Sequence, residues 1–160
     1  MDIEEINIEI PENSNIILGY SHFIKTVEDL NEIIKTTIPD SRYAVVFSEA
    51  SGERLIRYEG NDKSLIDSGI ENIKKISSGH TFIILLKNAY PINVLNAIKM
   101  CQEVGNIFAA TANPLKVIVA KTENGNAILG VSDGFAPLGI ETEKDKEKRR
   151  KLLRDIGYKF

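Results

Sequence analysis

The sequence predicts one α+β domain over residues 1–160, with a mixed β-sheet of about eight short strands and about four helices. The 160 residues are enough for one domain to bury a core without disulfides or a structural metal. The apolar fraction of 42% and the charged fraction of 27% are those of ordinary globular proteins. Strand patterns come in pairs and do not alternate strictly with helix patterns, which favours α+β over a doubly wound parallel sheet.

Two strands and a helix open the chain. Isoleucine at every second position over 6–10 predicts a half-buried strand, and the apolar run 15–19 predicts another. Thr26 and Asp29 have the spacing of an approximate capping box. They predict a helix that ends before Pro39.

A hairpin, a second helix and a buried strand follow. The runs 43–48 and 54–58 are predicted strands joined by a turn. Asn61 and Asp62 then cap a helix for which Gly79 is the predicted stop. The run 81–86 is apolar almost throughout, as in a strand covered on both faces.

The last part of the chain predicts two helices and three strands. Pro91 opens a helix over 91–104 whose apolar circumference predicts burial in the core or against another subunit. A charged helix over 143–156 is expected to dock only through its few apolar residues. The strands are predicted over 107–110, 117–120 and 127–131.

Composition excludes several classes of protein. The net charge of −3 argues against a dedicated nucleic-acid binder, which carries a strong basic excess. No apolar run approaches the roughly 18 residues that a membrane span needs. The acidic N-terminal residues are unlike an export signal, and the single cysteine, Cys101, excludes an intramolecular disulfide. We therefore expect a cytoplasmic protein that binds neither nucleic acid nor membrane.

Familiar catalytic and nucleotide-binding motifs are absent. One cysteine and two histidines cannot build a Cys-rich zinc site. G-x-G-x-x-G does not occur, and the one G-x-S-x-G string, over residues 130–134, is not followed directly by a predicted helix, as a nucleophile elbow requires. Gly125 and Gly130 have the spacing of a P-loop, but Val131 and Ser132 follow, so the lysine is missing. Any nucleotide must be held in another way.

The first candidate site is the segment before the first helix. His22 and Lys25 stand where backbone N–H groups and the helix dipole favour an anion. Ser21 and Thr26 add hydroxyl groups, so the segment is a candidate phosphate cradle beside a nucleophilic or acid–base imidazole. The alternative is that Thr26 only caps the helix and His22 hydrogen-bonds a turn.

Two more candidates lie at the start of a strand and of a helix. His80 directly precedes the most apolar strand, where it is either a satisfied buried histidine or a functional one. Asn61 and Asp62 stand at a helix N-terminus, and capping by Asp62 explains this pair without a ligand.

Asn93 and Asn96 lie one turn apart on an otherwise apolar helix. Buried amides need partners, so the pair either ties loops together or reads the polar edge of a ligand. Asn113 and Asp133 follow predicted strands, in Asn-Pro and Asp-Gly pairs that are also ordinary turn sequences.

Taken together, these segments resemble the family of small archaeal and bacterial adenosine-specific kinases. The resemblance extends from about residue 4 to the C-terminus, which is nearly the whole chain, and two of its strings, SHFIKTVEDL and PINVLNAIK, are long and specific. The segments that carry it are GYSHFIKTVEDL (19–30), FSEASG (47–52), GND (60–62), SGHTFIILL (78–86), PINVLNAIK (91–99), ATANP (110–114), ILGVSDG (128–134) and IGYK (156–159).

The resemblance implies an α+β fold unlike that of the usual nucleoside kinases, binding of adenosine and AMP, and a stably phosphorylated histidine. It also implies a homo-oligomer, either a trimer or a multiple of trimers. Only His22 and His80 are available for phosphorylation. His22 is preferred because Ser21, Lys25 and the helix start would stabilise a phosphoryl group beside it, and His80 is the rival.

The leading hypothesis is a phosphotransferase that passes a phosphoryl group from ATP or another donor to adenosine or AMP. In it, His22 carries the phosphoryl group, while Lys25 and the backbone at Thr26 neutralise charge. Asp133 orients the attacking hydroxyl or holds a magnesium ion. The residues expected to bind the nucleotide are Ser21, Thr26, Asn61, Asp62, Asn93, Asn96 and Asn113. The alternatives are a sensor that binds AMP without turnover and a purely structural oligomerisation module.

Overall fold

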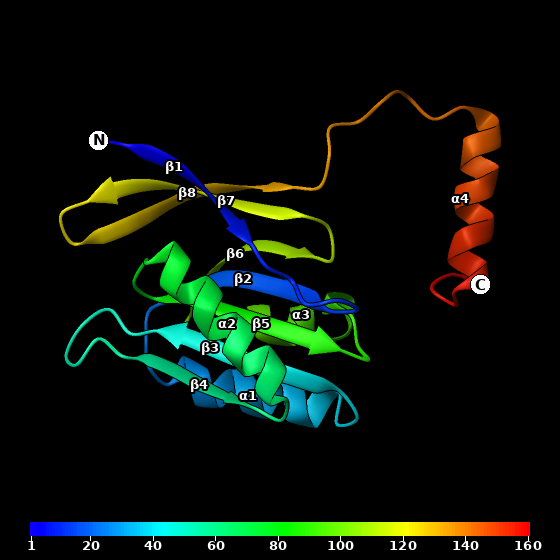
Figure 1. The fold of residues 1–160 in the computed structure, drawn as a ribbon. Coiled ribbons are helices and arrows are strands. Elements are labelled where there is room, and N and C mark those ends of the chain that lie inside the picture. The colour runs from blue at the N-terminus through cyan, green and yellow to red at the C-terminus, as the bar shows by residue number, and fades with distance from the viewer.

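Eight strands and four helices make up the computed structural model, which describes residues 1–160 (Figure 1). The predicted α+β class is confirmed. The elements are β1 (Ile3–Ile8), β2 (Asn15–Ser21), α1 (Thr26–Thr37), β3 (Arg42–Ser48), β4 (Ile56–Gly60), α2 (Lys63–Ile76), β5 (Thr81–Lys87), α3 (Pro91–Lys99), β6 (Val104–Thr111), β7 (Leu115–Thr122), β8 (Gly125–Asp133) and α4 (Glu143–Asp155). No helix is long and apolar enough to cross a bilayer.

The strands form two antiparallel sheets, and not the single mixed sheet that the strand patterns suggest. The larger sheet has the order β4-β3-β5-β2-β6, and the smaller has the order β1-β7-β8. Every pairing in both sheets is antiparallel. Apolar runs locate strands but do not specify their partners, which is why the sequence could not separate the two sheets.

The five-stranded sheet is covered on both faces. One face packs on α1 and α3, with Leu30, Ile34, Val94 and Ile98 among the residues buried there. The other face packs on α2 and the three-stranded sheet, and Leu65 and Val117 are buried in that layer. In Figure 1, α2 crosses the larger sheet, and β1, β7 and β8 lie along one side of it. The central strand β5 is buried from Thr81 to Leu86, as its apolar sequence predicts.

Two helix ends differ from the prediction. The helix that opens at Pro91 stops at Lys99, since Val104 already begins β6. Only Val94 and Ile98 of this short helix are buried, because it contacts the sheet along one face. Helix α2 ends at Ser77, whose left-handed backbone (φ 51°) supplies the stop expected at Gly79.

The capping box predicted at the start of α1 does not form. The N-cap residue is Lys25, which makes no side-chain capping bond. Asp29 instead binds the Lys25 ammonium group at 2.7 Å. The Thr26 hydroxyl contacts Ser21 Oγ and the carbonyl of Phe23, so it joins the helix start to the end of β2.

Helix α4 stands apart from the sheets at the end of an extended segment, residues 134–142 (Figure 1). Thr142 and Asp145 form its capping box, and no residue of the helix is buried. The expected docking residues are largely free, with Leu152 and Ile156 more than half exposed. Residues 134–160 are called the C-terminal arm below.

Candidate functional site

The two histidines lie close together at one end of the larger sheet. His22 directly follows β2, and His80 directly precedes β5. Because β2 and β5 pair antiparallel, the end of one meets the start of the other, and Ser21 N donates to the His80 carbonyl at 2.9 Å. Ser21, Lys25 and Thr26 belong to the same group, which we call the histidine cluster. The sequence-predicted members of this site are thus adjacent in space.

The His22 ring is fixed in one tautomer. Its Nδ1 lies 3.0 Å from the backbone carbonyl oxygen of Glu103. A carbonyl oxygen only accepts hydrogen bonds, so in neutral His22 the proton resides on Nδ1 and Nε2 carries the lone pair. The same carbonyl accepts from His22 N at 3.2 Å and from Ser21 Oγ at 3.0 Å. His22 is therefore an exposed, oriented imidazole with Nε2 as its nucleophilic atom.

His80 is held mainly by packing. Its ring stacks on Phe47 at a centroid distance of 5.9 Å and meets the Tyr20 ring edge-on at 6.0 Å. Burial, with a smaller contribution from the charge of His22, lowers the pKa of His80 below its ordinary value. His80 also has a left-handed backbone (φ 60°), and its amide donates to the Ser48 carbonyl at 2.7 Å. These contacts indicate that His80 packs as a neutral aromatic ring at the end of the sheet.

The backbone donors beside His22 differ from those predicted. The amides of Thr26, Val27 and Glu28 already donate to carbonyls of the turn that precedes α1, so Thr26 N is not available to an anion. One turn earlier, the amides of Phe23, Ile24 and Lys25 make no hydrogen bond within the chain. These three consecutive exposed donors follow His22 directly, and such an array favours an anion.

Lys25 adds the positive charge of this cluster. Its ammonium group is paired with Asp29, and that hydrogen bond raises the pKa of Lys25. The side chain is 43% exposed, so the ion pair is weak enough for an incoming phosphate to compete with it.

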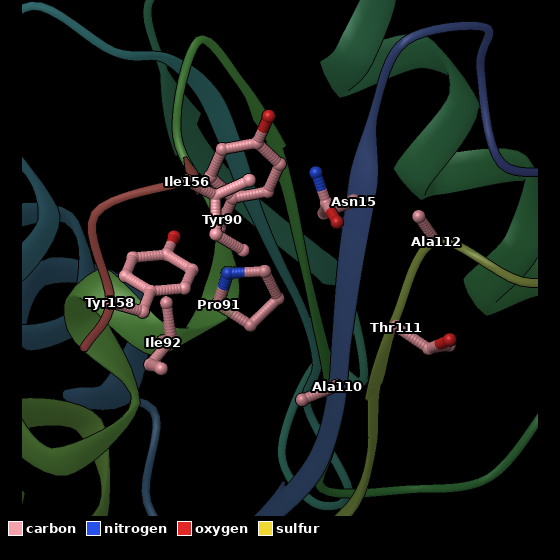
Figure 2. Close-up of a pocket in the computed structure, with 9 residues that line it drawn as sticks. All are labelled: Asn15, Tyr90, Pro91, Ile92, Ala110, Thr111, Ala112, Ile156 and Tyr158. Carbon is pink, nitrogen blue, oxygen red and sulfur yellow. The ribbon is translucent and has the colours of Figure 1, made fainter. Parts of the chain in front are cut away.

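A second site lies at the opposite end of the larger sheet (Figure 2). It is a largely apolar pocket of about 620 Å³, between the start of β2, the start of α3, the end of β6 and the end of the C-terminal arm. The rings of Tyr90 and Tyr158 offer aromatic surface on one side of it. Its lining residues are Asn15, Tyr90, Pro91, Ile92, Ala110, Thr111, Ala112, Ile156 and Tyr158.

Asn113 and Asp133 do not line the pocket, but hydrogen bonds connect them to Thr111 on its wall, away from the histidine cluster. Thr111 Oγ1, on the pocket wall, donates to Asp133 Oδ1 at 2.8 Å. Asn113 Nδ2 donates to the same oxygen at 3.3 Å, and Asn113 N donates to Thr111 Oγ1 at 2.9 Å. The three residues form a polar group next to the largely apolar pocket, and Thr111 is the member that lines it.

Asn93 and Asn96 are both exposed, so the expectation of buried amides on this helix is wrong. The Asn93 side chain accepts from Tyr90 N at 2.8 Å and thereby caps α3. Asn96 makes no side-chain hydrogen bond within the chain. The amides face solvent because α3 uses only one face for packing.

Asn61 and Asp62 have structural partners. Asn61 accepts from Tyr43 N at 2.8 Å and donates to the Ser41 carbonyl at 2.9 Å. Asp62 accepts from Ser64 N and Leu65 N at the start of α2, as capping requires. From Tyr43 to Ser48, where β3 meets His80, is roughly 17 Å at the rise of a strand. The pair therefore lies far from the histidine cluster.

The apolar pocket and the histidine cluster are also separated within one chain. They lie at the two ends of β2, and Asn15 is six residues from Ser21. At the rise of a strand, this corresponds to roughly 20 Å. A nucleoside in the pocket is therefore out of reach of His22 of the same chain.

Several residues at these sites were not predicted from the sequence. Glu103 falls where the apolar pattern predicts helix, and nothing in the pattern indicates that its carbonyl binds His22. Tyr90 and Tyr158 are 68 positions apart and meet only in the folded chain. The strings PINVLNAIK, ATANP and IGYK each contain residues that line the pocket, so they indicated its segments.

Known proteins share both the sequence and the fold of this chain. A comparison with curated proteins finds no match. Among solved structures, the PH1918 protein of Pyrococcus horikoshii OT3 is similar, with 47% sequence identity and a TM-score of 0.94 over 99% of this chain and 98% of that one. The family model described as "Adenosine specific kinase" matches residues 6–159. The chain therefore belongs to the adenosine-specific kinase family, as its sequence strings suggested.

Proposed function

We propose that this protein transfers a phosphoryl group to adenosine or AMP through a phosphohistidine at Nε2 of His22. The observation that carries the proposal is the hydrogen bond from His22 Nδ1 to the Glu103 carbonyl, which leaves Nε2 as the nucleophile. The free amides of Phe23, Ile24 and Lys25 lie beside this ring. His80 has neither a ring hydrogen bond nor three consecutive free amides beside it, so His22 remains the proposed site of phosphorylation.

The proposed chemistry has two steps. In the first, Nε2 of neutral His22 attacks the terminal phosphorus of ATP or another donor, and the bond from phosphorus to the leaving oxygen breaks, with its electron pair going to the leaving group. In the second, a hydroxyl oxygen of the acceptor attacks phosphorus. The N–P bond then breaks, its electron pair returns to Nε2, and the hydroxyl proton passes to a carboxylate or to water. The three amides and Lys25 stabilise the charge on the phosphoryl oxygens in both steps.

The nucleoside is proposed to bind in the apolar pocket of Figure 2. A volume of about 620 Å³ suits a small ligand, and Tyr90 and Tyr158 offer rings on which a purine can stack. Thr111 on the pocket wall, with Asn113 and Asp133 bonded to it, is proposed to meet the ribose hydroxyls. Asp133 is the proposed acceptor for the proton of the attacking hydroxyl. It is also the carboxylate that a magnesium ion on the donor phosphates would meet.

We propose a homo-oligomer because the C-terminal arm carries unusually exposed apolar side chains, and the family resemblance favours a trimer or a multiple of trimers. Phe135, Leu138 and Ile140 are at least 89% exposed on the extended segment. Such residues are normally covered, and a neighbouring copy is the simplest cover. Since the pocket and His22 of one chain are roughly 20 Å apart, transfer is proposed to take place between copies.

The single cysteine supports the further proposal of a cytoplasmic location.

The test is the intact mass of the protein after incubation with ATP and magnesium. We expect an acid-labile phosphoryl adduct on wild type and on His80→Asn, and none on His22→Gln. An adduct that persists in His22→Gln and disappears in His80→Asn would show that His80 carries the phosphoryl group, and it would overturn the proposal. Binding of AMP without any adduct or turnover would instead favour the sensor.

The pocket is tested separately by AMP titration. Ile92→Trp places a large ring in the pocket from an exposed position, so AMP affinity should fall. Leu129→Trp, on exposed β8 outside the pocket, is the matched control. Equal affinities for the two variants would place the nucleoside elsewhere.

A further inference from the structure

Three side chains of types that can ligate a metal lie close together near His22, and the phosphotransfer proposal does not use them. Asp29 comes from α1, and Cys101 and Glu103 come from the segment between α3 and β6. One ligand atom of each residue lies within 4.8 Å of the others. The Cys101 Sγ to Asp29 Oδ2 distance is 4.0 Å.

Glu103 is the unusual member of this trio. Its side chain is buried, with only 2% of the residue exposed, and neither carboxylate oxygen has a hydrogen-bond partner at normal geometry, although the Asp29 carboxyl and the Cys101 thiol lie beside it. A buried carboxylate without partners is costly, so it must either bind a proton or meet a cation. Glu103 forms no ion pair, and the ammonium group of Lys25 is bound to Asp29 instead. The unpartnered Glu103 oxygens therefore point to a ligand that the chain itself does not supply.

The trio can be reached from solvent. A cavity of about 390 Å³ opens between α1 and the end of α3, and Asp29 and Cys101 line its wall. Glu32 lines the same cavity but is exposed and does not belong to the trio. Small ions can thus enter on the side that the two partly exposed ligands face.

We propose that Asp29, Cys101 and Glu103 bind a divalent cation of the zinc class. One sulfur and two carboxylate oxygens suit borderline metals such as Zn²⁺ or Co²⁺, whereas magnesium and calcium prefer oxygen ligands alone. Metal–ligand bonds of about 2.0–2.3 Å bring ligand atoms to roughly 3.5 Å from one another, so atoms that now lie within 4.8 Å of one another need to approach by at most about 1.3 Å. The Cys101 proton is released to solvent when the sulfur binds.

The charges of the occupied site would balance. Two carboxylates and one thiolate carry −3, and a divalent cation together with the adjacent Lys25 carries +3. Three protein ligands leave one position open on the cavity side, as in sites that bind water or an anion. Because the Glu103 carbonyl orients His22, the cation would also stiffen the segment that holds this ring. The proposal does not depend on the phosphotransferase function.

The test uses the full-length protein after treatment with a chelator, titrated with Zn²⁺ or Co²⁺. We expect one equivalent to bind per chain, a rise in Tm, and a thiolate-to-Co²⁺ charge-transfer band. Cys101→Ser should lose the band, and Glu103→Gln should weaken binding by more than about tenfold. Glu32→Gln, on the same cavity, should bind as wild type does.

Glu103→Gln also separates the proposal from a structural role of the carboxylate. Removal of an unpartnered buried charge should leave the metal-free protein at least as stable as wild type. Its loss of cation binding then cannot be attributed to unfolding. The proposal is overturned if wild type shows neither the band nor a Tm rise, which would mean that the trio shares a proton instead.

Discussion

The Glu103 carbonyl oxygen accepts three hydrogen bonds from two successive residues, Ser21 and His22, at 3.0–3.2 Å. This one atom joins the end of β2 to the start of β6 and sets the orientation of the His22 ring. Ser21 is fully buried, and its hydroxyl also contacts Thr26. The position of His22 therefore depends on a buried polar network and not on the exposed ring alone.

Ser21→Ala should disturb this network. Loss of the hydroxyl leaves Thr26 and the Glu103 carbonyl each short of one partner, which should cost about 1–2 kcal/mol of unfolding free energy. The yield of phosphohistidine should fall as well, since the His22 ring loses its support. Urea unfolding and intact mass measure the two effects. Ser68→Ala, which removes a half-buried hydroxyl bonded to the Glu9 carbonyl, is the control and should leave the adduct unchanged.

His80 should make stability depend on pH. Its pKa is lowered on folding, chiefly by burial, from the ordinary value of 6.5. As the pH falls below 6.5, the unfolded chain takes up the proton before the folded chain does, so the free energy of unfolding decreases. Urea unfolding at pH 7.5 and at pH 5.5 measures this loss.

His80→Asn is the variant that isolates this effect, because asparagine tolerates the left-handed backbone at this position. The decrease in stability between the two pH values should be smaller in the variant than in wild type. An identical decrease in both proteins would assign the pH dependence to other groups.

Asp62→Ala should lower stability without changing AMP affinity. The carboxylate caps α2, and loss of such a cap costs about 1 kcal/mol. Hydrogen bonds from Ser64, chiefly, and from Leu65 lower the pKa of Asp62, so its stabilising effect is present near neutral pH and is lost as acid protonates the carboxylate. Thermal unfolding and AMP titration measure the two properties. Asp133→Asn should show the reverse pattern, with weaker AMP binding and little loss of stability, because Asp133 is exposed and bonded to Thr111 on the pocket wall.

The sequence predicted the local parts of this molecule better than their assembly. Strands and helices follow from the apolar spacing, and His22 stood out because it precedes a helix start. The meeting of His22 with His80 requires the β2–β5 pairing, which no local pattern specifies. Glu103 and Tyr158 were missed for the same reason, since Glu103 meets residues 81 and 82 positions away and Tyr158 meets Tyr90, 68 positions away. The strings shared with the family indicated the segment of Tyr158 but not its geometry, and none of them contains Glu103.

The C-terminal arm should be needed for assembly. Phe135, Leu138 and Ile140 face solvent in one chain, so replacing all three with serine should not disturb the core. If the arm packs on a neighbouring copy, the triple variant should have a smaller mass by light scattering than wild type. Far-ultraviolet circular dichroism should confirm that the variant is folded. Wild type that is itself monomeric would contradict this role of the arm.

Transfer between copies leads to a complementation test. His22→Gln keeps the pocket but cannot carry the phosphoryl group, and Ile92→Trp keeps His22 but has a filled pocket, so each should be inactive alone. Co-expressed, the two chains should regain AMP formation, because a phosphorylated His22 of one copy can meet the open pocket of another. A mixture that stays inactive, although mixed oligomers are present by mass, would mean that transfer occurs within one chain. In that case the C-terminal arm must move far enough to rebuild the pocket beside His22, since six residues of β2 separate the two sites in the structure.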